Sequence, residues 1–253
     1  MFGFELLEGE RIDTVNADIK LIQKKNGLTF GTDTYLLCAY VKPRKNAVMA
    51  ELGSGTGIAA LLSLSYNKCK HVHAIEVQEE FCSLISRNAK LNGLDDKITV
   101  HNTDVRNATP DMLGKEVDVV ISNPPYMKTD SGKRNAHDEK YIARHEVFGG
   151  IDDFCAAASR LLKHGGKFYC VYRPDRLIDL ISAMRNNKLE PKNMTFVHAH
   201  ENKEPSIVLV DAIKGGAPSL KITKPLFLYS SSDSGEMSDE SRAIYSRCSF
   251  YED

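Results

Sequence analysis

The chain has 253 residues, of which 42% are hydrophobic, and its 33 basic and 34 acidic side chains give a formal net charge of -1. This length and apolar content predict one large folded domain, or one domain with an extension, and exclude a mainly disordered chain. Because the net charge is close to zero, a polyanionic partner would have to bind a local basic patch.

Cysteine usage and the absence of long apolar runs predict a cytoplasmic protein. The six cysteines form no CxxC pair and have no histidine at metal-ligand spacing, so we expect reduced structural thiols and no metal site. The N-terminal residues lack a basic segment followed by an apolar one, and no apolar run approaches the roughly 18 residues of a membrane span. These features carry no information on the oligomeric state.

The segment before the core, residues 1–45, is expected to form a hairpin and a helix. Residues 18–24 alternate between polar and apolar side chains and reach an Asn-Gly turn, which indicates a short strand. The stretch GTDTYLLCAYV that follows has the pattern of a helix. We expect both elements to pack on the core.

From residue 46 onward, predicted strands and helices alternate. The expected strands are AVMAEL, HVHAIE, ITVHN, VDVVIS and KFYCVY, and the expected helices include IAALLSLSY, residues 78–92 and DDFCAAASRLLK. Gly165-Gly166 is expected to break the last of these helices, and another helix should follow Pro174. MTFVHAH and SIVLVDAIK, joined by a short charged loop, suit an antiparallel pair. The alternation predicts an α/β fold with a mostly parallel sheet.

The C-terminal stretch SSSDSGEMSDESR has low complexity and is acidic, so we expect a partly mobile extension there. The predicted organisation is therefore an N-terminal hairpin and helix at 1–45, a core domain at 46–229 and an acidic C-terminal extension at 230–253.

The stretch ELGSGTG, residues 51–57, follows the first core strand and is the first candidate for ligand binding. Gly53, Gly55 and Gly57 allow a tight turn and a close approach to a ligand, and the next helix offers free N–H groups. A dinucleotide fingerprint would need glycine where this chain has Ile58, and no Lys-Ser/Thr pair is present. The loop is therefore a poor NAD site, and a P-loop is excluded.

Acidic residues lie at the carboxyl ends of the next two predicted strands: Glu76 ends the second strand, and Asp104 comes shortly after the third. Glu76 lies about 20 residues after the loop, where such folds place a carboxylate that accepts from ribose hydroxyls. A helix start or a surface position would equally explain an acid there. Asp104 could accept from an adenine amino group, or it could form an Asx turn or an N-cap.

The stretch ISNPPYMK ends the fourth predicted strand with two consecutive prolines. The prolines lack amide donors and stop a sheet ladder, so a stiff turn explains them without any chemistry. Alternatively, they present Asn123 and Tyr126 rigidly at a pocket. Since ligands of open α/β sheets bind at the carboxyl ends of strands, we expect all four stretches to converge on one crevice.

ELGSGTG, Glu76, Asp104 and NPPY together resemble the class I S-adenosylmethionine-dependent methyltransferases that modify an amino nitrogen. LIQKKNGLTFGTDTYLL, YIARHEVF and EPSIVLVDAIKGGAPSLKITKPLFLY further resemble the bacterial tRNA(Val) adenine-N6 methyltransferase family. The resemblance implies a Rossmann-like, seven-stranded methyltransferase sheet, mostly parallel with an antiparallel last strand and helices on both faces. It also implies methyl transfer to an adenine N6 in tRNA, next to the anticodon of tRNA(Val).

The resemblance assigns roles to individual residues. The catalytic set is Asn123, Pro124 and Tyr126: the first two accept hydrogen bonds from the target amino group, and the ring stacks on the base. The substrate-binding set joins Pro125 and Tyr126 of the motif to basic residues of the stretch after it, which are candidates because of their charge: Lys128, Lys133, Arg134 and Arg144. The cofactor-binding set, in which Thr32 and Asp33 match least specifically, is Thr32, Asp33, Glu51, Gly53, Ser54, Gly55, Gly57, Glu76, Val77, Asp104, Val105 and Asn123.

Two groups of basic residues are candidates for contacts with RNA phosphates. One lies at 20–45 and the other in the long polar stretch 127–147, although scattered lysines are more often solvated surface. Other targets also stay open, because NPPY occurs in methyltransferases of rRNA guanine, DNA adenine and protein glutamine. A non-catalytic RNA-binding protein with a methyltransferase fold is the remaining alternative, disfavoured because binding alone does not need all four stretches.

Overall fold

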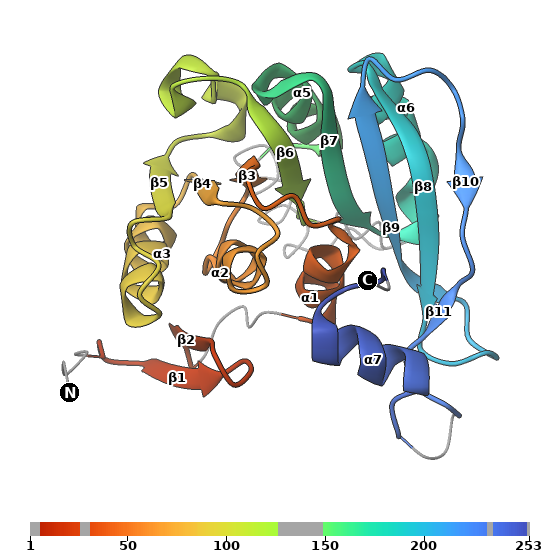
Figure 1. Ribbon diagram of the computed structural model, residues 1–253, viewed down its shortest axis with the longest axis horizontal. Helices are drawn as coiled ribbons and strands as arrows, with labels where there is room; N and C mark the ends of the chain where they lie inside the picture. Colours follow the sequence, from red (N-terminus) through yellow and green to blue (C-terminus); the bar gives the residue numbers. More distant parts are fainter. Residues whose placement is uncertain (1–5, 26–30, 126–148, 232–234, 252–253) are drawn as a thin grey trace, which may run out of the picture.

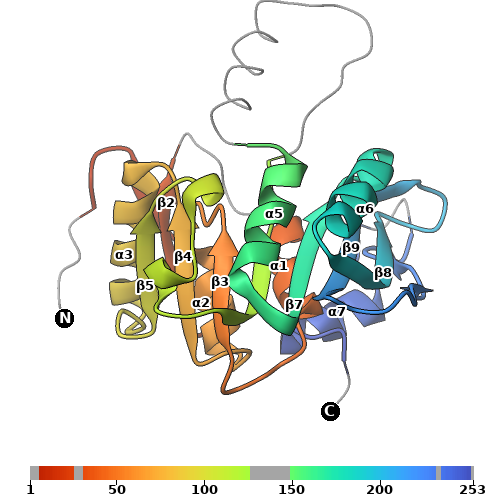
Figure 2. The same ribbon diagram turned by 90° about the horizontal axis from the view of Figure 1, so that it is seen from above.

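The computed structural model describes residues 6–25, 31–125, 149–231 and 235–251. Its centre is a twisted sheet with helices on both faces (Figure 1). The seven long strands lie in the order β5-β4-β3-β6-β7-β9-β8, labelled from left to right in Figure 1, and Figure 2 shows β5 and β8 on opposite sides of the molecule. Among these seven, β9 is antiparallel to both neighbours and the other neighbouring pairs are parallel. The predicted seven-stranded, mostly parallel sheet is confirmed.

Each long strand lies at a predicted strand position, although β7 and β8 both begin five residues earlier than expected. They are β3 (Val48–Leu52), β4 (His71–Glu76), β5 (Ile98–Asn102), β6 (Val117–Ser122), β7 (Leu162–Tyr172), β8 (Leu189–His198) and β9 (Pro205–Lys214). The sequence did not reveal two short strands that pair with β8 in parallel, β10 (Lys221–Ile222) and β11 (Leu226–Phe227). The described α-helices are α1 (Thr32–Tyr40), α2 (Ile58–Ser65), α3 (Glu79–Leu91), α5 (Ile151–Leu161), α6 (Leu177–Asn186) and α7 (Asp239–Arg247).

Alternate residues of the strands pack into two separate cores. In β3, Met49 faces the core that α1 and α2 cover, whereas Ala50 and Leu52 face the core that α5 and α6 cover. The strands are therefore apolar on both faces, as expected for parallel strands buried between helices. The described helices include none that is both long and apolar enough to cross a membrane.

The connection from α5 to β7 differs from the prediction. Helix α5 ends at Leu161 and β7 begins at the next residue, so Gly165 and Gly166 lie within the strand instead of ending the helix. The pairing with β6 shifts register here, Gly165 has φ +75°, and a Cβ on Gly166 would lie 2.8 Å from the Lys163 carbonyl. The glycines therefore permit an irregular strand, a local requirement that resembles a helix break in sequence.

The N-terminal hairpin is held against α3 by asparagine side chains. Strands β1 (Glu10–Thr14) and β2 (Lys20–Lys24) form a two-stranded antiparallel sheet. The fully buried Asn88 of α3 accepts from the Ile22 amide at 2.7 Å and donates to the Ile22 carbonyl at 3.1 Å. Asn88 also donates to the Thr56 carbonyl at 2.9 Å, so it connects the hairpin to the glycine loop.

Replacing Asn88 by alanine should lower the free energy of unfolding by about 2–4 kcal/mol, because buried peptide groups would lose their partners. Asn92 is the matched control, since it makes the equivalent pair of bonds to Lys20 in a more exposed position. Asn92→Ala should cost about 1 kcal/mol or less. Urea denaturation of both variants measures the difference, and equal losses would contradict the role given to Asn88.

The C-terminal segment packs on α1 and contributes to the core. Ser238 caps α7 by accepting from the Ser241 amide, and Ile244 and Cys248 are almost completely buried. The Tyr245 ring stacks on Tyr35 of α1 with centroids 4.5 Å apart. The low-complexity stretch, from which we expected a partly mobile extension, thus contains the start of α7. The apolar residues that bury this helix come after the acidic run.

Candidate active site

The register of the sheet brings the predicted stretches together. Leu52 of β3 is the register partner of both Ile75 in β4 and Ser122 in β6, and Glu76 is the partner of Asn102 in β5. The glycine loop, Glu76, Asp104 and Asn123 consequently leave the sheet at one edge. The expected convergence of the four stretches is confirmed by this pairing.

The loop contains three glycines, and the structure explains the absence of a side chain at Gly55 and at Gly57 in different ways. All three have positive φ, between +53° and +80°. A Cβ on Gly57 would lie 3.0 Å from Ile85, so close helix packing excludes a side chain there. A Cβ on Gly55 would meet nothing within 4 Å, which leaves its surface open to a ligand. Ser54 is instead buried and donates its amide to the Ile75 carbonyl at 3.1 Å, so it holds the loop against β4.

Glu76 is buried with its carboxylate directed at the loop. It accepts from the Gly55 amide at 2.9 Å and from the Gln78 amide at 2.9 Å. A carboxylate has about four acceptor positions, so these two bonds leave capacity for hydroxyl donors. Asn102, which sequence reasoning missed, donates to the carbonyls of Glu76 and Val77 and fixes the chain beside the carboxylate. The Val77 side chain itself is exposed.

Glu51 lies behind the glycine loop. Its side chain is buried and accepts from the Ala60 amide in the first turn of α2 at 3.1 Å. Burial raises the pKa of Glu51 to about 8, and the neighbouring Glu76 charge adds to this effect. Glu51 therefore supports the start of α2 in this structure.

The pH dependence of stability tests this environment of Glu51. Folding should take up a proton between pH 4.5 and about 8, because the folded pKa lies above the ordinary value of 4.5. The contribution of Glu51 is then fully present below pH 4.5 and falls by a few kcal/mol as the pH rises through about 8. Glu51→Gln keeps an acceptor without titrating, so its stability relative to wild type should increase from pH 5 to pH 8. Denaturant unfolding at three pH values measures this, and a constant difference would contradict it.

Asp104 follows β5 and caps the short 3-10 helix η1 (Val105–Asn107). It accepts from the Arg106 amide at 2.8 Å, and the Arg106 guanidinium beside it lowers the pKa of the carboxyl below its usual range. The N-cap considered from the sequence is thus present. The Val105 side chain is buried beneath this turn.

Asn123 and Pro124 leave β6 beside the glycine loop, and Pro125 is exposed. The Asn123 side-chain amide nitrogen donates to Thr34 Oγ1 at 2.9 Å. Ser122 adds a second tie to the loop strand by donating to the Leu52 carbonyl at 3.0 Å. Tyr126 and the predicted substrate-binding residues Lys128, Lys133, Arg134 and Arg144 lie outside the described residues.

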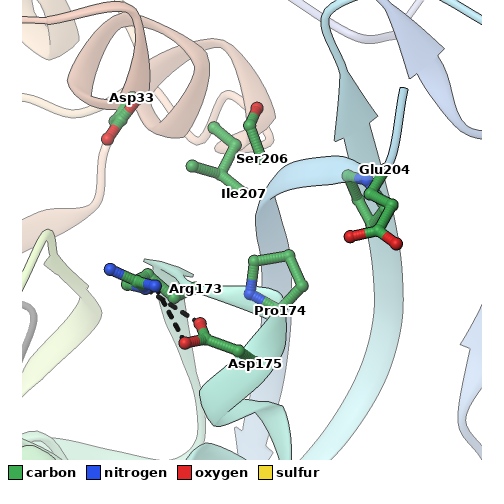
Figure 3. A pocket seen from close by; sticks show the side chains of 8 residues that line it. Asp33, Arg173, Pro174, Asp175, Glu204, Ser206 and Ile207 are labelled. Atoms are coloured by element: carbon green, nitrogen blue, oxygen red, sulfur yellow. Dashed lines mark hydrogen bonds and ion pairs between the residues drawn. The ribbon is translucent and has the colours of Figure 1, made fainter. Parts of the chain in front are cut away.

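Thr32 and Asp33, the first two residues of α1, have different neighbours. The Thr32 side chain lies close enough to the Tyr245 hydroxyl of α7 to act on its pKa, which burial raises. Asp33 lines a cavity of about 800 Å³, whose other walls are Arg173 to Asp175 after β7 and Glu204 to Ile207 at the start of β9 (Figure 3). Both Asp175 oxygens accept from Arg173 at 2.8 Å. No sequence pattern indicated this cavity, although Arg173 follows a strand at the same sheet edge as Asn123.

The basic residues of the N-terminal segment do not form one rim. Lys24 pairs with Glu80, whereas the Lys42 ammonium lies 4.7 Å from the centre of the Tyr251 ring. Arg44 belongs to the turn that leads into β3, at the edge opposite the glycine loop. The basic residues at 20–45 are therefore spread over the molecule, because the chain crosses it within this segment, and their contact with RNA phosphates stays a prediction.

Among the described residues, no group of three or more His, Cys, Asp and Glu side chains has the arrangement of a metal site. All six cysteines are buried free thiols.

The sheet order and the site together define a class I methyltransferase. A family model described as "Methyltransferase small domain" matches residues 25–187, and the chain belongs to this family. Methyltransferases of this class use S-adenosylmethionine as the methyl donor.

Comparisons with individual proteins agree with this class. A tRNA1(Val) (adenine(37)-N6)-methyltransferase of Phocaeicola vulgatus is 29% identical over 181 residues, covering 71% of this chain and 74% of that protein. The protein of the same name from Parabacteroides distasonis is 26% identical over 191 residues, covering 74% and 77%. A crystal structure of a predicted O-methyltransferase from Agrobacterium tumefaciens has a TM-score of 0.69 at 22% identity, covering 87% of this chain and 98% of that one. This last similarity shows the fold.

Proposed function

We propose that the protein transfers a methyl group from S-adenosylmethionine to the exocyclic N6 of an adenine in tRNA, next to the anticodon of tRNA(Val). The observation that carries this proposal is the pairing of Leu52 with Ser122, which places the glycine loop and Asn123-Pro124 side by side. The printed names of the relatives support the substrate and the position. A tRNA substrate and buried reduced thiols agree with a cytoplasmic protein.

The described residues fit the cofactor. The open surface at Gly55 allows the methionine portion to approach the backbone, and the positive N-terminal end of α2 favours its carboxylate. Glu76 would accept from the ribose hydroxyls, and Asp104 with Val77 and Val105 would line the adenine. The bound sulfonium would supply an already activated methyl group, so no metal is required.

Asn123 and Pro124 would orient the target nitrogen. Its lone pair is delocalised into the adenine ring, which makes the amino group a poor nucleophile. The Asn123 Oδ1 and the Pro124 carbonyl, both acceptors, would bind the two N–H groups and favour a pyramidal nitrogen. Held in this way, the nitrogen would accept the methyl group that the sulfonium supplies; the carbon–sulfur bonding pair would stay on S-adenosylhomocysteine, and the extra proton on nitrogen would pass to water. Most of the rate gain would come from this alignment.

The cavity beside α1 suits the RNA around the target. Its walls carry the carboxylates of Asp33, Asp175 and Glu204 and the guanidinium of Arg173. Such walls favour base edges that donate hydrogen bonds over phosphates. Phosphate contacts would then fall to the basic residues of 127–147, and stacking on the target base to Tyr126.

Methylation of total tRNA by the purified protein tests the proposal. With methyl-labelled S-adenosylmethionine, nucleoside analysis should find the label in N6-methyladenosine, and isolated tRNA(Val) should be the preferred acceptor. Separate reactions with rRNA, adenine-containing DNA and a protein extract serve as controls. Label in another nucleoside, or only in DNA or protein, would overturn the substrate assignment.

A further inference from the structure

We propose that Thr34 is a positioning residue that sets the orientation of the Asn123 side-chain amide. This inference rests on the role of Asn123 in the proposed function. The Thr34 hydroxyl oxygen accepts from the Asn123 amide nitrogen at 2.9 Å, across 89 residues of sequence. The amide oxygen is thereby directed away from Thr34.

The orientation matters because the two ends of an amide have opposite hydrogen-bonding properties. The oxygen accepts and the nitrogen donates, yet the two ends have nearly the same shape. The terminal torsion of asparagine is broad and roughly two-fold, so the side chain does not select one orientation by itself. A reversed amide would present N–H donors to the N–H donors of the substrate. In this structure the nitrogen end is bound to Thr34, and this contact stops the side chain from rotating away from the orientation that presents its oxygen elsewhere.

Thr34 is suited to this task because its own position is restrained. It lies in the first turn of α1, and a β-branched side chain has few χ1 rotamers in a helix. The next residue, Tyr35, stacks on Tyr245 and donates to the Tyr245 carbonyl at 2.7 Å. Further along α1, Cys38 donates to the Ala59 carbonyl of α2. Helix α1, before the core domain, and helix α7, after it, thus pack against each other beside Thr34. This packing restrains the residue that binds the Asn123 amide.

The position of Thr34 also extends the site beyond the central sheet. Its neighbour Asp33 lines the cavity beside β7 and β9, so one helical turn touches both that cavity and Asn123. If the Thr34–Asn123 bond only stabilised the fold, removing the Thr34 hydroxyl would lower activity equally with or without the Asn123 amide. If Thr34 positions that amide, the loss should disappear when the amide is absent. That difference gives the experimental test.

The test is a double-mutant cycle of Thr34→Val and Asn123→Ala, measured as single-turnover incorporation of methyl label from S-adenosylmethionine into tRNA. Thr34→Val alone should lower the rate roughly three- to tenfold, the size expected for one lost hydrogen bond. Cofactor affinity and the thermal midpoint should stay unchanged. In the Asn123→Ala background the same substitution should have no further effect.

Two more variants control the cycle. Thr34→Ser keeps the hydroxyl and should restore the rate to within about twofold of wild type. Thr14→Val replaces an exposed threonine of β1 and should leave the rate unchanged. An unchanged or faster Thr34→Val enzyme, or an equal loss in both backgrounds, would overturn the inference. Because the cycle measures total label, a product other than N6-methyladenosine would overturn the proposed function while Thr34 is still tested.

Discussion

Asn123→Ala is expected to lower the rate of methyl transfer about a hundredfold, the effect of removing one preorganised hydrogen-bonding group from an active site. The loss should appear in single-turnover measurements with saturating cofactor and tRNA. Cofactor affinity should change little, because the glycine loop and Glu76 hold their positions through bonds to β4, Gly55 and Gln78. A large loss of rate with nearly unchanged binding would identify Asn123 as a group that acts mainly in the transition state.

The control for this prediction is Asn187→Ala, at the end of α6, where the amide bonds only to a carbonyl of its own helix. Its rate should equal that of wild type. If Asn123→Ala kept wild-type activity, the Asn-Pro-Pro stretch would be a stiff turn and nothing more. If it lost cofactor binding and activity together, Asn123 would belong to the cofactor site.

The sequence predicted those site residues that lie at, or shortly after, the end of a parallel strand. Gly53 and Gly55 lie in the loop after β3, Glu76 is the last residue of β4 and Asn123 directly follows β6, and the pairing of these parallel strands brings their carboxyl ends together. Alternating apolar runs indicated those strands, because their buried faces require them. The convergence of these residues could therefore be predicted from the parallel arrangement of the strands alone.

Other features depended on contacts that no local pattern records. The Thr34–Asn123 bond joins residues 89 positions apart, and nothing near either residue distinguishes a positioning hydroxyl from a surface threonine. The cavity is formed by α1, β7 and β9, which meet only in the folded chain. Helix α7 was obscured by its acidic, serine-rich start, although Ser238 is an ordinary N-cap for it.

For Asp104, the sequence left two physically sound alternatives: an acceptor for the adenine amino group, or an Asx turn or N-cap. The structure confirms the N-cap, with Arg106 bound to the same carboxylate. An acceptor role toward adenine stays a prediction, since an ionised carboxylate can accept further hydrogen bonds. The lowered pKa of Asp104 favours that ionised form.

Glu76→Ala should raise the dissociation constant of S-adenosylmethionine about 10- to 100-fold, because bonds from hydroxyls to a charged acceptor contribute about 1.5–3 kcal/mol. Isothermal titration calorimetry measures this directly. Thermal unfolding provides a second measurement: at a ligand concentration of 100 Kd the wild type gains about 2.7 kcal/mol, and a hundredfold weaker variant gains only about 0.4 kcal/mol. Glu79→Ala, an exposed acid three residues later, is the matched control and should bind as wild type does.

A weakened Glu76→Ala variant has two possible causes, because Glu76 also accepts from the Gly55 amide and so supports the loop. Comparing S-adenosylhomocysteine with its 2′-deoxy and 3′-deoxy forms separates them. If the carboxylate binds the ribose, removing a hydroxyl should weaken binding to wild type several-fold more than binding to Glu76→Ala. Equal losses in both proteins would mean that Glu76 acts only through the loop, and the ribose contact would then have to come from another residue at the same sheet edge.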